Sequence, residues 1–168
     1  MKRQRDRTKG QTEIIAYKAF FKDPEGLVND LDGIHYKVGE IYVTNDPLQF
    51  GRGGFHMCEK FEDCFKYLLA TEADVELTLV KGFGHMYGVD AGDGAYDDTL
   101  GYVYMCEKMQ ILKVFSREEI IGMALGLCGM RLEEFLKSYP LTDNEEKVII
   151  DHFESLGYLK QKIKKKEK

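Results

Sequence analysis

The sequence predicts an α+β fold with a mixed, mainly antiparallel β-sheet core that carries one packed helix, followed by a small helical C-terminal subdomain. Three observations lead to this prediction. Residues 12–20 divide into two faces with the period of a strand, Ile15, Tyr17 and Ala19 against Ile14, Ala16, Lys18 and Phe20, and residues 73–82 alternate apolar and polar side chains. Residues 59–70 place apolar side chains at helical spacing. After Ser116, two capping boxes mark the starts of further helices.

The first half of the chain predicts extended segments separated by turns. TEIIAYKAF (12–20) is the first strand, and its aromatic and β-branched content supports it. FKDPEGLVNDLDG (21–33) is loop-like because proline and glycine punctuate it. IHYKVGEIYVT (34–44) is extended around a turn or bulge at 38–40, and FHMC (55–58) is a short strand after a glycine-rich loop.

The second half predicts the remaining elements. An amphipathic helix covers 59–70, and a strand covers 73–82. The segment 83–98 is expected to be a long excursion, because four glycines and four aspartates disfavour regular structure. GYVYMCEKMQILKVF (101–115) predicts a strand pair or one bent strand with a break at Glu107-Lys108.

The capping boxes begin at Ser116 and Thr142, each with a glutamate three residues later, and Gly157 fits a helix C-terminus. Four regions follow from these patterns. We expect a disordered basic N-terminus at 1–12, an α+β core domain at 13–121, a helical C-terminal subdomain at 122–160, and a basic tail at 161–168.

Composition limits the partners. The net charge of −5 disfavours a protein built to coat nucleic acid, so nucleic acid is not expected beyond weak contacts of the basic tails. No segment has the roughly 18 apolar residues of a membrane span, and no apolar run follows the basic N-terminal residues as in a secretory leader. Four cysteines without paired spacing favour reduced thiols and a cytoplasmic location.

The stretch GRGGFHMCEK (51–60) carries most of the chemically reactive residues, and three interpretations compete for it. A zinc site could join His56 and Cys58 to Cys64 and Cys106, but the paired spacing of structural zinc sites is missing, so no metal is predicted. Cys58 could act as a nucleophile with His56, although a catalytic pair normally meets across the fold with a third orienting group. The third interpretation is a structural turn from strand to helix, which the glycine pair would allow.

Several segments in the order IIAYKAF, GIHYKVGEIY, GGFHMCEKFEDCFKYL, VELTLVKG and YVYMCEKMQILKVFSREEI together resemble one family. It is an uncharacterised domain of phage and bacterial proteins with an AYK-F strand, a Y-x-V/E-G-x-x-Y strand and a GFH-x-CE turn. The resemblance covers roughly residues 13–121, and GFHMCE is its most specific part. It implies a phage or mobile-element link but no known activity.

FGRGGFHMCEKFEDCFKYL (50–68) is also similar to a strand and helix of ADP-ribosyltransferase-like domains, which bind NAD against a split sheet. This similarity implies that Lys18 would meet a phosphate with help from Arg52, while Phe55 or His56 would line the nicotinamide pocket. The late catalytic glutamate of those enzymes has no clear counterpart, since neither Glu107 nor Glu76 has the partner residue that marks arginine-directed transferases.

We therefore expect a binding or interaction module for an unidentified protein or small molecule. The predicted ligand site is the 52–59 turn facing the first strand. Its residues are Tyr17, Lys18, Arg52, Phe55, His56 and Glu59. The alternative is an ADP-ribosyltransferase-like enzyme or a degenerate form of one, with His56 and Glu107 as catalytic candidates; NAD is expected as a cofactor under that alternative alone. The sequence does not decide whether the protein is an enzyme.

Overall fold

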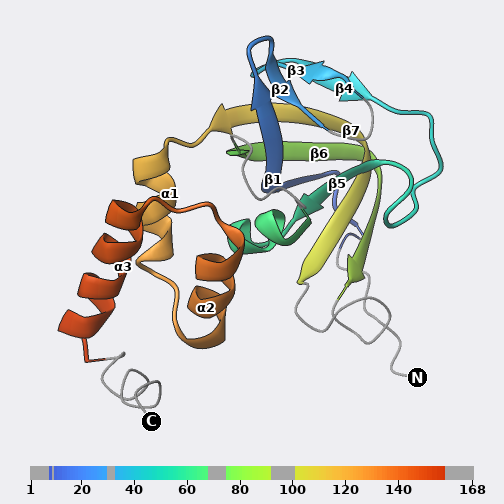
Figure 1. Cartoon of the computed structure of the whole chain (residues 1–168). Coiled ribbons are helices and arrows are strands. Elements are labelled where there is room, and N and C mark those ends of the chain that lie inside the picture. The colour runs from blue at the N-terminus through green and yellow to red at the C-terminus, as the bar shows by residue number, and fades with distance from the viewer. Residues whose placement is uncertain (1–7, 9, 30–32, 68–74, 92–100, 158–168) are drawn as a thin grey trace. The chain divides into compact units, whose positions relative to one another are not determined.

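A computed structural model describes residues 8, 10–29, 33–67, 75–91 and 101–157. The chain forms two compact units, residues 1–115 and 116–168. The first contains a mainly antiparallel β-sheet and one short helix, and the second contains three helices (Figure 1). This is the α+β class that the sequence predicts. The strands are β1 (Glu13–Asp23), β2 (Gly26–Val28), β3 (His35–Tyr36), β4 (Ile41–Val43), β5 (Phe55–Cys58), β6 (Val75–Asp90) and β7 (Tyr102–Val114).

Four of the strands close into a ring. The long strand β6 pairs with β1 on one side and with β7 on the other. The short strand β5 also pairs with both, through Tyr17 opposite Cys58 and through residues 55–58 opposite 103–106. The ring therefore runs β1–β6–β7–β5 and back to β1, and its closure places the first strand beside the GFHMC segment, far away in sequence.

The inside of this ring is the core of the first unit. Ile14, Ala16 and Phe20 lie on one face of β1 and are buried. They belong to a cluster with Leu27, Tyr36, Met57, Val80, Tyr102, Tyr104, Cys106, Met109 and Ile111. Side chains alternate across a strand with a period of two, so Lys18 lies on the same inward face. Between Ile14 and Phe20, the core face of β1 is thus apolar except at this lysine.

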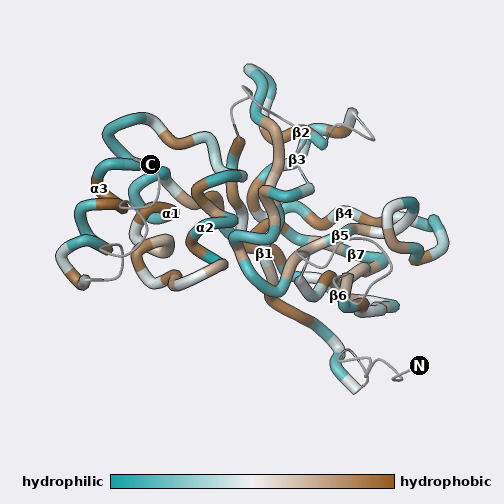
Figure 2. The backbone as a smooth tube through the Cα atoms, turned by 60° about the horizontal axis from the view of Figure 1, so that its bottom comes forward, coloured by the Kyte–Doolittle hydropathy of each residue, from teal (hydrophilic) through white to brown (hydrophobic). Residues whose placement is uncertain are grey.

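Residues 21–33, predicted as a loop, instead contain a hairpin. β1 continues to Asp23 and pairs with β2 across a tight turn. The Asp23 carboxylate accepts hydrogen bonds from the backbone N–H groups of Glu25 and Gly26, at 2.8 and 3.0 Å, which is how an aspartate stabilises such a turn. The tip of this hairpin is hydrophilic (Figure 2).

The predicted excursion at 83–98 was wrong for its first part, because β6 continues to Asp90. The register between β6 and β7 shifts between Phe83 and Met86, so one strand carries an extra residue there. Gly84 has a positive φ of 82° at this bulge. The backbone N–H of His85, the next residue, donates a hydrogen bond to the Glu107 carboxylate at 3.2 Å. The glycines therefore permit a bulged strand and do not end it; residues 92–100 lie outside the described part.

The predicted amphipathic helix at 59–70 is a 3₁₀-helix, η1 (Phe61–Tyr67), over the described residues. All five residues from Phe61 to Phe65 are buried, including the two acidic ones, Glu62 and Asp63. Phe61, Cys64 and Phe65 of the predicted apolar stripe are buried, but so are the positions between them. Residues 61–65 therefore lack the one-sided burial that an amphipathic helix would show.

In the second unit, two of the three described helices begin at the capping boxes that the sequence predicts. Its helices are α1 (Arg117–Ala124), α2 (Gly129–Ser138) and α3 (Asp143–Ser155). Both predicted capping boxes are confirmed, at Ser116 and Thr142, and Gly157 has the positive φ expected after α3. No helix among the described residues is long and apolar enough to cross a membrane.

Candidate functional site

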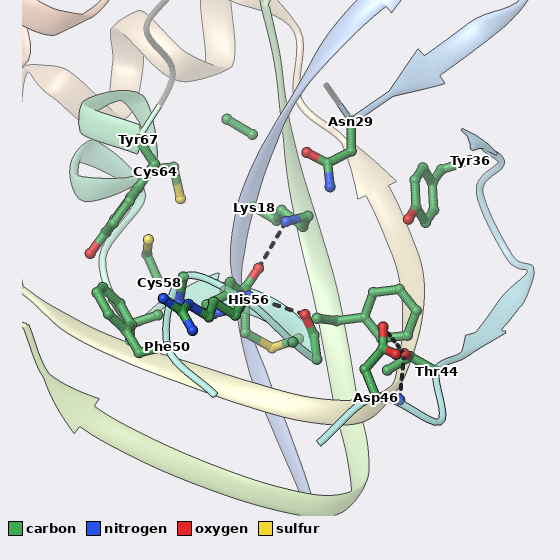
Figure 3. A pocket seen from close by; sticks show the side chains of 18 of the residues that line it. Lys18, Asn29, Tyr36, Thr44, Asp46, Phe50, His56, Cys58, Cys64 and Tyr67 are labelled. Atoms are coloured by element: carbon green, nitrogen blue, oxygen red, sulfur yellow. Dashed lines mark hydrogen bonds between the residues drawn. The ribbon is translucent and has the colours of Figure 1, made fainter. Parts of the chain in front are cut away.

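A pocket of about 490 Å³ opens in the first unit between β1, β5 and the segment 43–54 (Figure 3). This volume lies within the roughly 300–1,000 Å³ typical of small-molecule sites. β1, β3, the β4–β5 segment, β5, η1 and β7 all contribute to its wall. The lining residues are Tyr17, Lys18, Ala19, Asn29, Ile34, Tyr36, Val43, Thr44, Asp46, Phe50, Gly51, Arg52, Gly53, Gly54, Phe55, His56, Met57, Cys58, Cys64, Tyr67 and Val103.

Lys18 extends into this pocket from the inward face of β1. Its ammonium donates a hydrogen bond to the backbone carbonyl of His56 at 3.0 Å (Figure 3). It also lies 5.3 Å from the centre of the Phe20 ring, within the range of a cation–π contact. The charged end of Lys18 therefore lies at the pocket surface, held by the His56 carbonyl and the Phe20 ring.

His56 organises the loop that forms one wall. Its Nε2 accepts a hydrogen bond from the Gly51 N–H at 2.9 Å, so Nδ1 carries the proton and donates to the Gly54 carbonyl at 3.1 Å. Burial, and then the positive charge of Lys18, lower the pKa of His56 from its ordinary value of 6.5. The imidazole is therefore neutral near pH 7, and both its nitrogens are occupied by the loop.

The loop itself needs its glycines. Gln49 and Gly53 form a bridge, with backbone hydrogen bonds of 3.0–3.1 Å between them. Gly54 has a φ of +84°, and a Cβ there would lie 2.6 Å from the Leu48 side chain. A Cβ at Gly53 would clash with the Pro47 carbonyl. The glycine pair thus allows the close turn that presents Arg52 and Phe50 at the pocket.

Aromatic rings line two sides of the pocket. Phe50 makes edge contacts with His56 and Tyr67, with centroids 5.9 and 6.3 Å apart. Tyr36 contacts Phe55 at 6.5 Å on the other side. Tyr67 is 39% exposed, so part of its ring remains available at the pocket surface. The wall can therefore contact a flat apolar group.

Two buried thiols in this part of the first unit, those of Cys64 and Cys106, have raised pKa values. Cys58 and Cys64 both line it and are buried. Burial, and then the adjacent Cys58 thiol, raise the pKa of Cys64 well above its ordinary value. Burial also raises the pKa of Cys106 to about 12. Among the residues that the structure describes, no group of three or more His, Cys, Asp and Glu side chains is placed to hold a metal ion.

Five of the six residues predicted for a ligand site line this one pocket, namely Tyr17, Lys18, Arg52, Phe55 and His56. Glu59 lies outside the lining; its carboxylate accepts from the Tyr104 hydroxyl at 3.3 Å. Glu107 also lies outside it, at the β6 bulge described above. The structure therefore does not bring the two catalytic candidates, His56 and Glu107, together at the pocket.

Sequence reasoning did not include several residues of the wall. Phe50 and Tyr67 flank the predicted turn, and the helical spacing from Cys64 to Tyr67 was a signal that could have found the second of them. Asn29, Tyr36 and Asp46 come from segments that reach the pocket through the curvature of the sheet. No local pattern in the sequence marks them.

Fold and site together define a small α+β protein with a pocketed antiparallel β-ring. Residues 14–121 match the family model of a domain of unknown function, DUF7666. The match covers more than half of the chain, so this protein belongs to that family, and it coincides with the segment whose motifs predict an uncharacterised family. No curated protein and no solved structure matches the chain.

Proposed function

We propose that this protein is a binding module and that the pocket between β1, β5 and the 43–54 segment is its small-molecule site. The observation that carries the proposal is Lys18, a charged side chain on the inward face of a core strand. Placing an ammonium among apolar neighbours costs stability unless polar groups compensate. A pocket of suitable volume lies at this residue, which is where a ligand would use such a charge.

Binding fits the remaining groups better than catalysis. His56 could act as a base only by giving up the hydrogen bond from Gly51, and that bond holds the loop. Asp46, the one carboxylate among the described residues that line the pocket, accepts from the Thr44 hydroxyl at 3.2 Å. The proposal therefore assigns these groups to holding the wall.

The alternative, an NAD-binding enzyme similar to ADP-ribosyltransferases, has one supporting observation: Lys18 and His56 lie together, as the similarity implies. It requires a glutamate beside the bound cofactor, and Glu107 bonds elsewhere. The test is release of nicotinamide from NAD by the full chain. Our proposal expects no turnover above that of a His56→Ala variant, and turnover lost in that variant would favour the enzyme.

Binding is tested by recording amide NMR spectra of the full chain with and without small-molecule fragments, which are anionic, neutral or cationic. We expect some fragments to shift the signals of Gly51, Gly53 and Cys58. Tyr67→Ala should weaken this binding, whereas Tyr87→Ala should not, because Tyr87 is similarly exposed at 44% but lies outside the lining. If no fragment shifts pocket signals at millimolar concentration, the proposed function is wrong.

The phage or mobile-element link and the cytoplasmic location remain predictions from the motif resemblance and the composition. A protein partner also remains open. It would be tested by recovering partners with the wild-type chain and asking whether a pocket-binding fragment displaces them.

A further inference from the structure

The pocket carries positive charge at two depths. Lys18 supplies the inner charge, and its field reaches the wall, since it contributes to the lowered pKa of His56. Arg52 supplies the outer charge from the glycine loop, where it is exposed. The Arg52 guanidinium makes no hydrogen bond or ion pair with any residue that the structure describes. It can therefore turn toward a ligand without breaking a contact of that kind.

The negative charge in the wall is smaller and is already engaged. Asp46 is exposed on the segment before the loop. Its carboxylate accepts a hydrogen bond from the Thr44 hydroxyl, and its backbone N–H donates a hydrogen bond to the Thr44 hydroxyl oxygen at 3.1 Å. Two cations therefore face one engaged carboxylate across the described lining. This balance favours an anionic ligand over a cationic or neutral one.

The aromatic wall sets the shape of the rest of the ligand. Phe50 and Tyr67 lie edge to face on the same side of the pocket as the loop. Tyr36 and Phe55 form the facing aromatic pair. Tyr36 is itself only 2% exposed, so a flat ligand ring would pack mainly against Phe50 and Tyr67.

We propose, on the basis of the binding function above, that the ligand is a small planar anion: an aromatic or heteroaromatic ring that bears a carboxylate or a phosphate. The acidic group accepts hydrogen bonds from the Lys18 ammonium, and the ring lies against Phe50 and Tyr67. Arg52 closes on the same acidic group or on a second one from the pocket mouth. Guanidinium and ammonium groups both form strong, charge-assisted hydrogen bonds with such oxygens.

The experiment measures the affinity of the full chain for a matched series of probes by calorimetry. Naphthoate and naphthyl phosphate carry the anion, naphthamide is neutral, naphthylmethylamine is cationic, and acetate and inorganic phosphate lack the ring. We expect one or both aromatic anions to bind about tenfold or more tightly than every other probe. The comparison of naphthoate with naphthyl phosphate identifies which acidic group the pocket prefers.

Two variants locate the interaction. Lys18→Met keeps the length of the stem and removes the charge, so the preference for the anion should fall about tenfold or more. Lys81→Met is the matched control, because Lys81 also lies over a phenylalanine two residues later but is not in the pocket. Its affinity should stay within about twofold of the wild type, and Arg52→Gln, at an exposed position, should weaken anion binding less than Lys18→Met does.

The outcomes separate the two proposals. If naphthamide or naphthylmethylamine binds as tightly as the anions, the ligand class is wrong and the binding function stands. If the ring-free anions bind as well as the aromatic ones, the planar part of the inference is wrong. If Lys18→Met and Lys81→Met have equal effects, the assignment of the anion to Lys18 is overturned. If no probe and no fragment binds, the binding function itself fails.

Discussion

Lys18 on β1 and Lys81 on β6 occupy the same local motif on neighbouring, paired strands, yet they have different environments. Each precedes a phenylalanine by two residues, and each ammonium lies over that ring, at 5.3 Å for Phe20 and 5.6 Å for Phe83. Lys81 faces the Glu13 carboxylate at 3.9 Å, and that glutamate is 60% exposed. Lys18 instead bonds to the His56 carbonyl inside the pocket.

The difference between the two lysines comes from strand position. Phe20 is 1% exposed and belongs to the core cluster, so its face of β1 points into the ring. Phe83 is only half-buried and lies at the β6 bulge. A lysine beside a buried phenylalanine is carried inward with it, whereas the same pair at the surface forms an ordinary solvated contact. The motif alone therefore does not define a site; the face of the strand does.

The largest expected effect comes from the two phenylalanines. Phe20→Ala should lower the free energy of unfolding by about 3–5 kcal/mol, because it leaves a cavity in the ring. Phe83→Ala should cost about 1 kcal/mol. Urea unfolding of the two variants measures both values. Equal losses would contradict the assignment of Phe20 to the inward face and Phe83 to the outer one.

The next effect concerns His56, whose carbonyl accepts from Lys18 and whose ring holds the loop. His56→Ala removes two hydrogen bonds and should cost about 1–3 kcal/mol of unfolding free energy. His85→Ala is the control at an exposed position and should change stability by about 0.5 kcal/mol or less. Denaturant unfolding measures both variants. If His56→Ala leaves the unfolding free energy unchanged, the imidazole does not hold the loop.

Titration sharpens the same point. The pKa of His56 is lowered from 6.5, so its stabilising effect is present above that value and is lost as pH falls through the folded pKa. The pKa of His35 is raised, chiefly by its 2.8 Å hydrogen bond with Asp23, so its contribution is present below 6.5 and is lost as pH rises through the folded pKa. NMR titration of the imidazole signals should therefore place His56 below His35. The reverse order would contradict both environments.

The smallest expected effects are those of the lysines on stability. Lys81→Met removes a long ion pair, 3.9 Å to the exposed Glu13 carboxylate, and should change the unfolding free energy by less than about 1 kcal/mol. Lys18→Met keeps most of the packing of the stem and should also stay within about 1 kcal/mol of the wild type. The two variants should thus differ in anion binding far more than in thermal or urea stability. A Lys18→Met variant that unfolds would show that the lysine serves the fold.

Part of this structure could be predicted from the sequence. Alternation groups Ile14, Ala16, Lys18 and Phe20 on one face of β1, without telling which face is inward, and the glycine pair predicts the turn that carries Arg52 to His56. Capping boxes predict the starts of α1 and α3, because those signals lie within a few residues of each other. Local patterns go no further than this, because strand β2, the continuation of β6 and the 3₁₀ form of η1 depend on pairing and burial between distant segments.

The candidate site shows the same limit. Lys18 lies in a segment with a strand pattern, and Phe55 and His56 follow a glycine pair that marks a turn. These patterns allow the three residues to be predicted as one site from the sequence. Tyr36 and Asp46 reach the pocket only because the ring closes and β3 and β4 lie at the ends of the strand order. Glu107 illustrates the converse, since the similarity to ADP-ribosyltransferases made it a catalytic candidate and its carboxylate instead accepts a hydrogen bond from the His85 N–H at the β6 bulge.

The central claim is that the Lys18 ammonium lies in a ligand pocket while that of Lys81 does not. Its most direct test is an NMR spectrum of the lysine ammonium groups of the full chain, recorded with and without naphthoate, in which Lys81 serves as an internal reference. We expect the Lys18 signal to shift with added naphthoate and the Lys81 signal to stay in place. Equal shifts of both signals, or a Lys18 signal that does not move while naphthoate binds, would contradict the claim.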